Sequence, residues 1–366
     1  MRMIEQRKQT REIRISDIAI GGSAPISVQS MTKTDTRDIK ATVRQIKKLE
    51  EAGCEIVRCA VPDKEAAEAL GQIRKRISIP LVADIHFDHR LALISLEKGV
   101  DKLRINPGNI GERSKVEKVV QKARERGVPI RIGVNSGSLE KDILKKYGAV
   151  TPQAMVESAL RHIRIMESMD FDSLVVSIKA PDIRRTVESY RLFSRKTDYP
   201  LHIGITESGS AFSGSIRSSV GLGILLSEGI GDTLRVSVTG DPVEEVRIGR
   251  EILRALGLRM DGPIIYSCPV CGRCQIDMAR VAARIERGLA GVRDPIRIAI
   301  MGCAVNGPGE AVESDLGIAG GKKEALIYRD GKMRRKVREK DLVKEFLREV
   351  EDFLNGRKNS GPGVRH

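Results

Sequence analysis

The sequence predicts an α/β protein made of an N-terminal TIM (β/α)8 barrel and a smaller C-terminal α+β domain. Two observations predict the barrel: eight short β-branched or Leu-rich runs, and helical patterns that separate them. Eight alternations in about 255 residues match a TIM barrel, whereas an open doubly wound sheet more often uses five or six strands. A third observation, the change of rhythm near residue 258, predicts a second domain. We therefore expect domains at residues 1–258 and 259–366.

The eight predicted strands are spaced regularly along the first domain. They cover residues 26–29, 55–61, 80–85, 102–106, 129–134, 173–178, 200–206 and 233–238. Between them lie segments such as residues 39–53, 116–127 and 154–168, whose apolar residues recur three and four apart. Several of these segments end at glycine, which is a common helix stop signal.

The second domain has a mixed pattern of short elements. A cysteine-rich turn at residues 266–274 precedes a predicted helix at residues 275–288, and a strand at residues 295–301 leads into a glycine-rich loop at residues 302–310. A strand at residues 315–320 follows, then a hairpin that turns at Asp330-Gly331, a dipeptide favoured in type I′ turns. Residues 340–354 predict a closing helix.

The composition restricts the compartment and the partners. Mean hydropathy is −0.23 and no apolar run approaches the roughly 18 residues of a membrane span, so we expect no membrane residence. The N-terminus has no apolar signal region, which predicts a cytoplasmic protein. With 64 Lys+Arg against 49 Asp+Glu the net charge is +15, which favours anionic partners. Aromatic residues make up 3% and Trp is absent, so stacking platforms for nucleic acid are scarce and we expect no nucleic-acid partner.

Polar and basic residues gather where the predicted strands end, which is the face on which TIM barrels build their sites. One such residue by itself is commonly solvated or paired with a loop. Four cations that converge on one mouth instead suit a diphosphate, since Arg forks and a Lys point charge match its oxygens. The strand ends offer Gln29, Ser30, Arg58, Asp84, His86, Arg104, Asn106, Asn135, Ser136, Lys179, Thr206, Glu207, Arg235 and Ser237.

The strongest motif is Cys268-Pro-Val-Cys271-Gly-Arg-Cys274, followed by Cys303 and Glu310. Two thiolates two residues apart bind one metal centre from a single turn, and Cys303 adds a third ligand from a glycine-rich loop. The fourth ligand is open on chemistry alone. Cys274 would give an all-cysteine electron-transfer cluster, whereas Glu310 would leave one iron with a displaceable ligand. A zinc knuckle is the simpler alternative, although a second C-x2-C pair is missing.

The combination of these motifs resembles the hydroxymethylbutenyl diphosphate synthase family, the iron-sulfur enzymes of the non-mevalonate isoprenoid pathway. The resemblance spans residues 14–354. It rests on CPVCGR paired with GCAVNGPGE, preceded by SVQSMT, VRCAVP, ADIHF, LRINPGN, GVNSGSL, SIKA, LHIGITESG and LRVSV. The length is that of the bacterial two-domain form, a TIM barrel followed by a cluster-binding domain.

The resemblance implies a reaction and a set of site residues. The reaction is the two-electron reductive ring opening of 2-C-methyl-D-erythritol 2,4-cyclodiphosphate to 4-hydroxy-3-methylbut-2-enyl diphosphate and water. The resemblance implies a [4Fe-4S] cluster held by Cys268, Cys271, Cys303 and Glu310, and Glu207 as the acid of the barrel. The predicted substrate-binding residues are Arg58, His86, Arg104, Asn106, Asn135, Lys179, His202, Arg235 and Ser237.

The resemblance also implies partners. Flavodoxin or ferredoxin supplies the electrons, and both are acidic proteins that suit a basic surface. A homodimer shares each site between two chains. The sequence departs from the family at Cys274, where relatives usually carry another residue, and we keep Glu310 as the fourth ligand. Two alternatives of other classes are a ferredoxin-like electron-transfer protein and a basic RNA-binding protein with a structural zinc.

Overall fold

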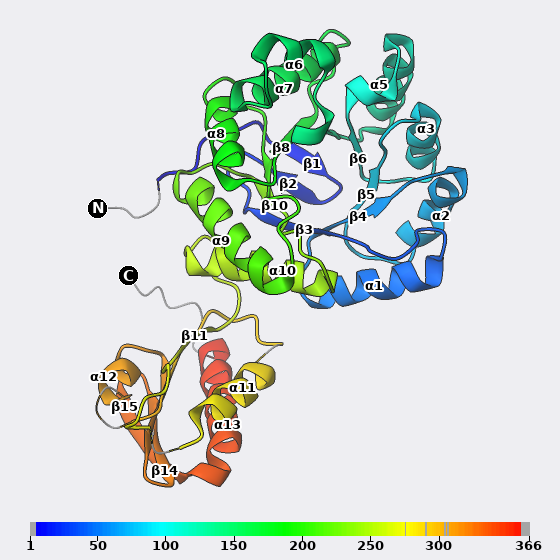
Figure 1. Ribbon diagram of the computed structural model, residues 1–366. Coiled ribbons are helices and arrows are strands. Elements are labelled where there is room, and N and C mark those ends of the chain that lie inside the picture. The colour runs from blue at the N-terminus through cyan, green and yellow to red at the C-terminus, as the bar shows by residue number, and fades with distance from the viewer. Residues whose placement is uncertain (1–4, 275, 290, 304, 306, 360–366) are drawn as a thin grey trace. The chain divides into compact units, whose positions relative to one another are not determined.

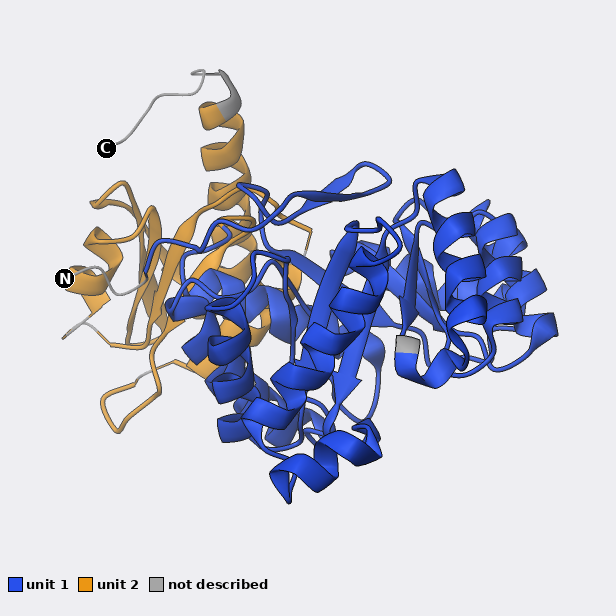
Figure 2. Cartoon of the chain, turned by 90° about the horizontal axis from the view of Figure 1, so that it is seen from above, with its two compact units in different colours: residues 1–259 blue, residues 260–366 orange. Residues whose placement is uncertain are grey.

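The structure is a computed structural model that describes residues 5–274, 276–289, 291–303, 305 and 307–359. The chain forms two compact units, Met1–Arg259 and Met260–His366, which Figure 2 colours separately. Each unit has its own apolar core.

Unit 1 is built on an eight-stranded parallel sheet in the order β8-β7-β6-β5-β4-β3-β10-β9. A parallel bridge from Val176 to Leu201 joins the two ends, which makes the sheet a barrel. All eight predicted strands are confirmed, and only the last two are much shorter than predicted. The strands are β3 (Ser27–Met31), β4 (Ile56–Ala60), β5 (Leu81–Asp84), β6 (Lys102–Ile105), β7 (Ile130–Asn135), β8 (Leu174–Lys179), β9 (His202–Ile203) and β10 (Thr233–Leu234).

Helices surround the barrel, as Figure 1 shows. Several begin at an aspartate whose carboxylate accepts a backbone N–H of the first turn, as Asp38, Asp63 and Asp182 do. The elements between the strands are α1 (Ile39–Glu51), α2 (Lys64–Arg74), α3 (His89–Glu97), α4 (Pro107–Ile110), α5 (Arg113–Arg126), η1 (Ser136–Ser138), α6 (Lys141–Tyr147), α7 (Pro152–Glu167), α8 (Ile183–Ser194), α9 (Ala211–Ser227) and α10 (Pro242–Ala255).

The barrel strands separate apolar from polar side chains by alternation. On β7, Ile130, Ile132 and Val134 belong to the apolar core that the helices cover. Arg131 and Asn135 of the same strand instead line a cavity inside the barrel. Because alternate residues of a strand face opposite sides, the same rule puts Lys102 and Arg104 of β6 on the inner face. The stability of unit 1 therefore comes from the layer between sheet and helices, while the interior is available for chemistry.

An N-terminal hairpin closes the lower end of the barrel. Its strands β1 (Ile13–Ile15) and β2 (Ile18–Ile20) pair antiparallel. Ile15 and Ile20 are fully buried in one cluster with Ile56 and Val82, which stand near the starts of β4 and β5. The sequence analysis did not predict this hairpin. It forms an apolar floor at the end of the barrel opposite to the strand ends that carry the polar residues.

Unit 2 is a mixed five-stranded sheet in the order β11-β12-β13-β14-β15. The predicted hairpin is confirmed: Asp330 and Gly331 have φ of 50° and 72°, as a type I′ turn requires. Strand β11 and helix α12 were not predicted, and α11 begins three residues later than expected. The elements are β11 (Ile264–Ser267), α11 (Met278–Gly288), β12 (Arg297–Met301), α12 (Gly307–Val312), β13 (Leu316–Gly321), β14 (Glu324–Arg329), β15 (Lys332–Arg338), η2 (Glu339–Asp341) and α13 (Leu342–Asn359).

None of the helices in the described part of the chain is both long and apolar enough to cross a membrane.

Candidate active site

A cavity of about 150 Å³ opens inside the barrel at the carboxyl ends of the strands. We call it the mouth cavity. Residues from seven of the eight strands, or from the loops that follow them, contribute to its wall, so the closed barrel brings together side chains that are far apart in sequence. Its lining consists of Arg58, Asp84, His86, Arg104, Arg131, Asn135, Ser177, Lys179, Thr206, Arg235 and Ser237.

Asp84 organises one side of the mouth cavity. Its carboxylate lies 3.5 Å from Nε of Arg58 and 3.1 Å from a terminal nitrogen of Arg104, and both guanidinium groups are nearly buried. Burial by itself would raise the pKa of Asp84, but Arg58, His86 and Arg104 outweigh it and hold this pKa well below its usual range. Asp84 is therefore an anion that keeps two cations in place and is not a proton donor near neutral pH.

Glu245 is a second buried carboxylate that holds cations in place, here Arg235 and Lys33. This residue of α10 is 1% exposed, and its carboxylate lies 3.0 Å from Arg235 and 3.3 Å from Lys33. It also accepts a 2.9 Å hydrogen bond from the Ser30 hydroxyl. The buried carboxylate of Glu245 thus holds the guanidinium of Arg235 in the wall of the mouth cavity.

Lys179 has no carboxylate partner among the residues that the structure describes. It is 8% exposed at the end of β8, and burial together with Arg131 and Arg235 lowers the pKa of its amine well below the usual value. A Cβ at Gly204 would lie 2.7 Å from its Nζ, so the glycine makes room for the amine. Likewise a Cβ at Gly133 would lie 2.7 Å from Nε of Arg104. The cavity wall is shaped around its cations.

The cavity holds more positive than negative charge, because Asp84 faces five cations in the lining. Buried cations without enough counter-charge destabilise the fold, and an anionic ligand would supply the missing negative charge. Arg forks, one Lys and the neutral donors Asn135, Ser177 and Ser237 form the donor set that phosphate oxygens require.

The structure brings seven of the predicted substrate-binding residues together in the mouth cavity and leaves three predicted residues outside its lining. Asn106 caps α4, where its amide oxygen accepts the Gly108 N–H at 3.1 Å. His202 is fully buried on β9, two residues before Gly204 on the inner face. Glu207 is exposed in the loop after β9, with φ of 53°. The seven in the lining are Arg58, His86, Arg104, Asn135, Lys179, Arg235 and Ser237.

Sequence reasoning missed Arg131 and Ser177, because it considered only the ends of the strands. Arg131 is 1% exposed and stands between Ile130 and Ile132, both of which pack outward. A charged residue in alternation with apolar ones is a recognisable signal once the inner face of the barrel is expected to be polar. Ser177 of β8 follows the same alternation.

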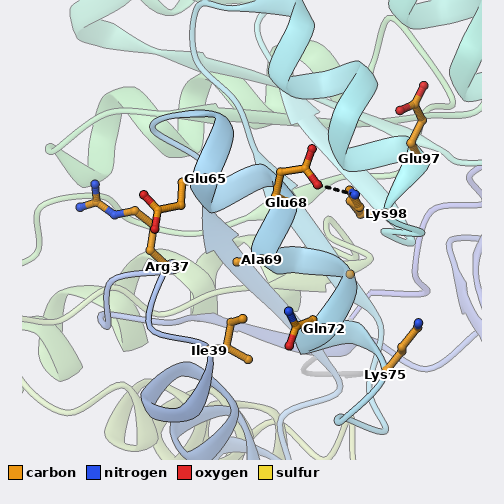
Figure 3. Close-up of a pocket in the computed structure, with 10 residues that line it drawn as sticks. Arg37, Ile39, Glu65, Glu68, Ala69, Gln72, Lys75, Glu97 and Lys98 are labelled. Carbon is orange, nitrogen blue, oxygen red and sulfur yellow. Dashed lines mark ion pairs between the residues drawn. The ribbon is translucent and has the colours of Figure 1, made fainter.

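A larger hollow of about 530 Å³ lies on the outer face of unit 1, over α2 and the neighbouring ends of α1 and α3 (Figure 3). Its acidic and basic residues partly neutralise one another, as in the ion pair of Glu68 with Lys98 that Figure 3 marks. It takes no residue from a strand end. We therefore place the active site in the smaller mouth cavity.

The cysteines of unit 2 gather at one edge of its sheet. Strands β11 and β12 are parallel neighbours, and Cys268 directly follows β11, with its N–H bonded to the Ile300 carbonyl at 2.9 Å. Cys303 follows β12 by two residues, and Glu310 lies in α12 just beyond. Cys271 is exposed in the turn, after Val270 with φ of 63°. By their chemistry, three thiols and a carboxylate are a donor set that fits an iron-sulfur centre.

The side chains themselves are not drawn together: no three His, Cys, Asp or Glu residues in the described ranges form a metal-binding group. Cys274 differs from the other cysteines of the motif. Its Sγ donates to the Ile276 carbonyl at 3.1 Å and packs against the apolar core of unit 2. A Cβ at Gly302 would lie 2.5 Å from this sulfur. Cys274 is thus partly buried against the core of unit 2.

Similar proteins cover nearly the whole chain. Residues 10–250 match the family model described as the GcpE TIM-barrel domain, and residues 264–352 match the GcpE protein C-terminal domain. A 4-hydroxy-3-methylbut-2-en-1-yl diphosphate synthase (flavodoxin) of Geobacter sulfurreducens is 60% identical over 95% of this chain and 99% of its own length. One of Caldanaerobacter subterraneus subsp. tengcongensis is 57% identical over 96% and 99%.

Among solved structures, a dihydropteroate synthase from Stenotrophomonas maltophilia superposes with a TM-score of 0.50. It is 13% identical and covers 68% of this chain and 97% of its own. At this identity the likeness concerns the fold alone.

The role of Asp84 generates a prediction about stability. Asp84→Asn should lower the free energy of unfolding by about 3–5 kcal/mol at pH 7, because it leaves Arg58 and Arg104 buried without their anion. Chemical denaturation of both proteins measures the difference. The pKa of Asp84 is depressed in the folded state, so its contribution is complete above its unfolded pKa of about 3.9 and is lost as pH falls through the folded value. The difference should therefore stay constant from pH 8 to about pH 5.

The control is Asp35→Asn, which breaks an exposed pair with Arg37 and should change stability far less. Equal effects of the two substitutions would contradict the organising role of Asp84.

Proposed function

The chain belongs to the family of 4-hydroxy-3-methylbut-2-en-1-yl diphosphate synthases, and we propose that its mouth cavity binds the cyclic diphosphate which that activity consumes. It is an iron-sulfur oxidoreductase of isoprenoid biosynthesis. The proposed substrate is 2-C-methyl-D-erythritol 2,4-cyclodiphosphate. The observation that carries the assignment to this cavity is the excess of cations over carboxylates in its lining. Neither alternative, a ferredoxin-like carrier or an RNA-binding zinc protein, is supported by the full-length relatives.

The reaction requires two electrons and two protons, and it releases one water. We propose that Cys268, Cys271, Cys303 and Glu310 hold the cluster and that it is of the [4Fe-4S] type. The cluster, when bound, supplies electrons one at a time. Support comes from Cys268 and Cys303, which follow the neighbouring strands β11 and β12, and from Cys274, whose sulfur packs against the core.

Within the barrel, the residues of the mouth cavity hold the diphosphate and stabilise it as the carbon–oxygen bond to phosphate breaks. The oxygen that leaves carbon becomes more negative, and Arg58, Lys179 and Arg235 of the cavity wall would stabilise that charge. Asp84 holds Arg58 and Glu245 holds Arg235, so these two guanidinium groups need little reorganisation during the reaction. Exclusion of water from the cavity strengthens each of these contacts.

Glu207 is the proposed proton donor to the departing hydroxyl. It follows Thr206, which lines the mouth cavity, but its own side chain is exposed in this structure. A carboxyl group holds its proton near neutral pH when it is buried. The surface that covers the mouth in the working enzyme would provide that burial.

We propose that this cover is the cluster domain of a second copy in a two-fold homodimer. The support is in unit 1: Arg259, its last residue, donates to the Ile26 carbonyl at 3.0 Å and pairs with Glu55 at 3.1 Å. Ile26 and Glu55 precede β3 and β4, so the chain leaves the barrel at the floor, opposite to the mouth. The printed names of the relatives favour flavodoxin as electron donor, and ferredoxin remains the alternative. We place the protein in the cytoplasm, where thiols stay reduced.

The fourth cluster ligand is tested by two substitutions in the C-terminal unit. Cys274→Ser should retain about four irons and four sulfides per chain after anaerobic purification, together with its activity. Glu310→Ala should lose most turnover, even where iron is retained. Iron and sulfide analysis and turnover with reduced flavodoxin measure both. The reverse pattern would move the ligand to Cys274, and one zinc with no sulfide would contradict the cluster.

The mouth cavity is tested by Lys179→Ala and Arg235→Ala. Each removes a buried cation from the diphosphate site, so each should weaken substrate binding at least tenfold, equivalent to about 1.4 kcal/mol or more. Glu207→Gln should lower kcat by about 10²-fold or more while the fold and the iron content stay unchanged. Lys75→Ala, an exposed residue of the outer hollow, is the matched control and should behave as wild type. Wild-type kinetics for Lys179→Ala, Arg235→Ala and Glu207→Gln would place the active site elsewhere.

The shared site is tested by mixing two inactive variants, Glu207→Gln and Cys268→Ser, under conditions that allow subunits to exchange. If each site uses a barrel from one chain and a cluster from the other, a mixed dimer has one intact and one doubly damaged site. Half of the dimers are mixed, so activity should recover to roughly a quarter of wild type. Exchange shown by mass spectrometry without recovered activity would mean that each chain closes on its own barrel.

A further inference from the structure

A buried lysine lies directly below the mouth cavity and has no role in the reaction as derived above. Lys102 begins β6, two residues before Arg104, so both side chains point into the barrel about 6.5–7 Å apart along the strand. Lys102 is 0% exposed, and its Nζ has no hydrogen-bond partner among the described residues. A buried ammonium normally has three acceptors, so an isolated one requires an explanation.

No carboxylate of the described residues forms an ion pair with Lys102. Below it, Ile56, Val82 and the N-terminal hairpin form the apolar floor, so the mouth is the open side. Arg58 of β4 and Arg131 of β7 add positive charge, as does Lys179 of β8 farther up the barrel. Asp84 of β5 is the nearby carboxylate, and Arg58, Arg104 and His86 already engage it.

The neutral neighbours do not supply a partner either. His202 of β9 is fully buried, and both of its ring nitrogens are without a partner in the described part of the chain, as are both amide atoms of Gln29 on β3. Burial, followed by Lys179 and Arg131, lowers the pKa of His202 well below its usual value, so this ring is neutral. In the same way burial, followed by Arg131 and Arg58, lowers the pKa of Lys102 well below the value of a free lysine. The pKa of Lys179 is lowered in the same direction, but Lys179 lines the mouth cavity and is 8% exposed, whereas Lys102 is 0% exposed and lies outside the lining.

We propose that Lys102 is an uncharged amine while the mouth cavity is empty and takes up a proton from solvent when a diphosphate binds above it. The inference rests on the proposed function, since it needs a multiply charged anion in the mouth cavity. The bound anion offsets the field of Arg58, Arg104 and Arg131, and the amine lone pair then accepts one proton without any change to the ligand. Lys102 would act as a positioning residue that adds one cation behind Arg104 and Arg131 only in the occupied site.

This arrangement gives the barrel two properties that a permanent charge would not. The empty barrel avoids one unpaired buried cation, which would otherwise destabilise the fold. The occupied barrel gains one more positive charge, and it gains most from the ligand with the most negative charge. Lys102 would therefore favour a diphosphate over a monophosphate, beyond the contacts made in the cavity itself.

The test is a count of protons. Inorganic pyrophosphate is titrated into the holoenzyme by calorimetry at pH 7.5 in two buffers of different ionisation enthalpy, which gives the protons exchanged per bound ligand. The proteins are wild type, Lys102→Met and the exposed control Lys75→Met. Wild type and Lys75→Met should take up about one more proton per site than Lys102→Met, and Lys102→Met should bind more weakly, by about fivefold or more. A purely structural lysine would not change the proton count.

The stability of the variant is a second readout. If Lys102 is neutral in the empty protein, Lys102→Met should unfold at the same denaturant concentration as wild type or a higher one, and Lys102→Gln should also fold. Equal proton counts in wild type and Lys102→Met, or failure of both neutral variants to fold, would overturn this inference alone. If pyrophosphate does not bind to wild type, the proposed diphosphate site is wrong and the inference falls with it.

Discussion

The structure of the barrel depends on holding several cations close together in its interior. Arg58, Arg104, Arg131, Lys179 and Arg235 line one small cavity, and each resists burial. Asp84 and Glu245 offset part of this charge from opposite sides of the mouth. The remaining imbalance is tolerated because the apolar core lies outside the sheet, between strands and helices, where the charges do not reach it. The proposed affinity for a phosphorylated ligand and the energetic cost of burying these cations therefore have the same cause.

That constraint explains features of the sequence that packing alone would not require. Glycine normally weakens a strand, yet Gly133 lies within β7 because a side chain there would collide with Arg104. Gly204 shortens β9 but leaves room for Lys179 and for the close carbonyl of Arg235. At both positions a glycine without a side chain leaves the space that the extended cationic side chain occupies inside the barrel.

The two units divide the work between charge and redox chemistry. Unit 1 presents its cations on strands, which suits the proposed recognition of a fixed diphosphate geometry. Unit 2 presents thiols from the ends of β11 and β12, where turns leave Cys271 exposed. Cys274 differs from Cys271, although the two are separated by only two residues: its sulfur packs against the core beside Gly302. A cysteine motif by itself thus does not say which thiols face outward.

The sequence by itself determined the strands of the barrel, the hairpin at Asp330-Gly331 and the family, because hydrophobic alternation, turn residues and motif spacing are local properties of the chain. It also indicated most of the cationic lining, since residues at the ends of parallel strands must converge. Only the tertiary structure decided which polar residues share one cavity. In the closed barrel Arg131 lines the cavity. Asn106 instead caps a helix, and Glu207 is exposed. Closure of the barrel also sealed Lys102 and His202 beneath the mouth, because burial and partnership depend on neighbouring strands that are distant in sequence.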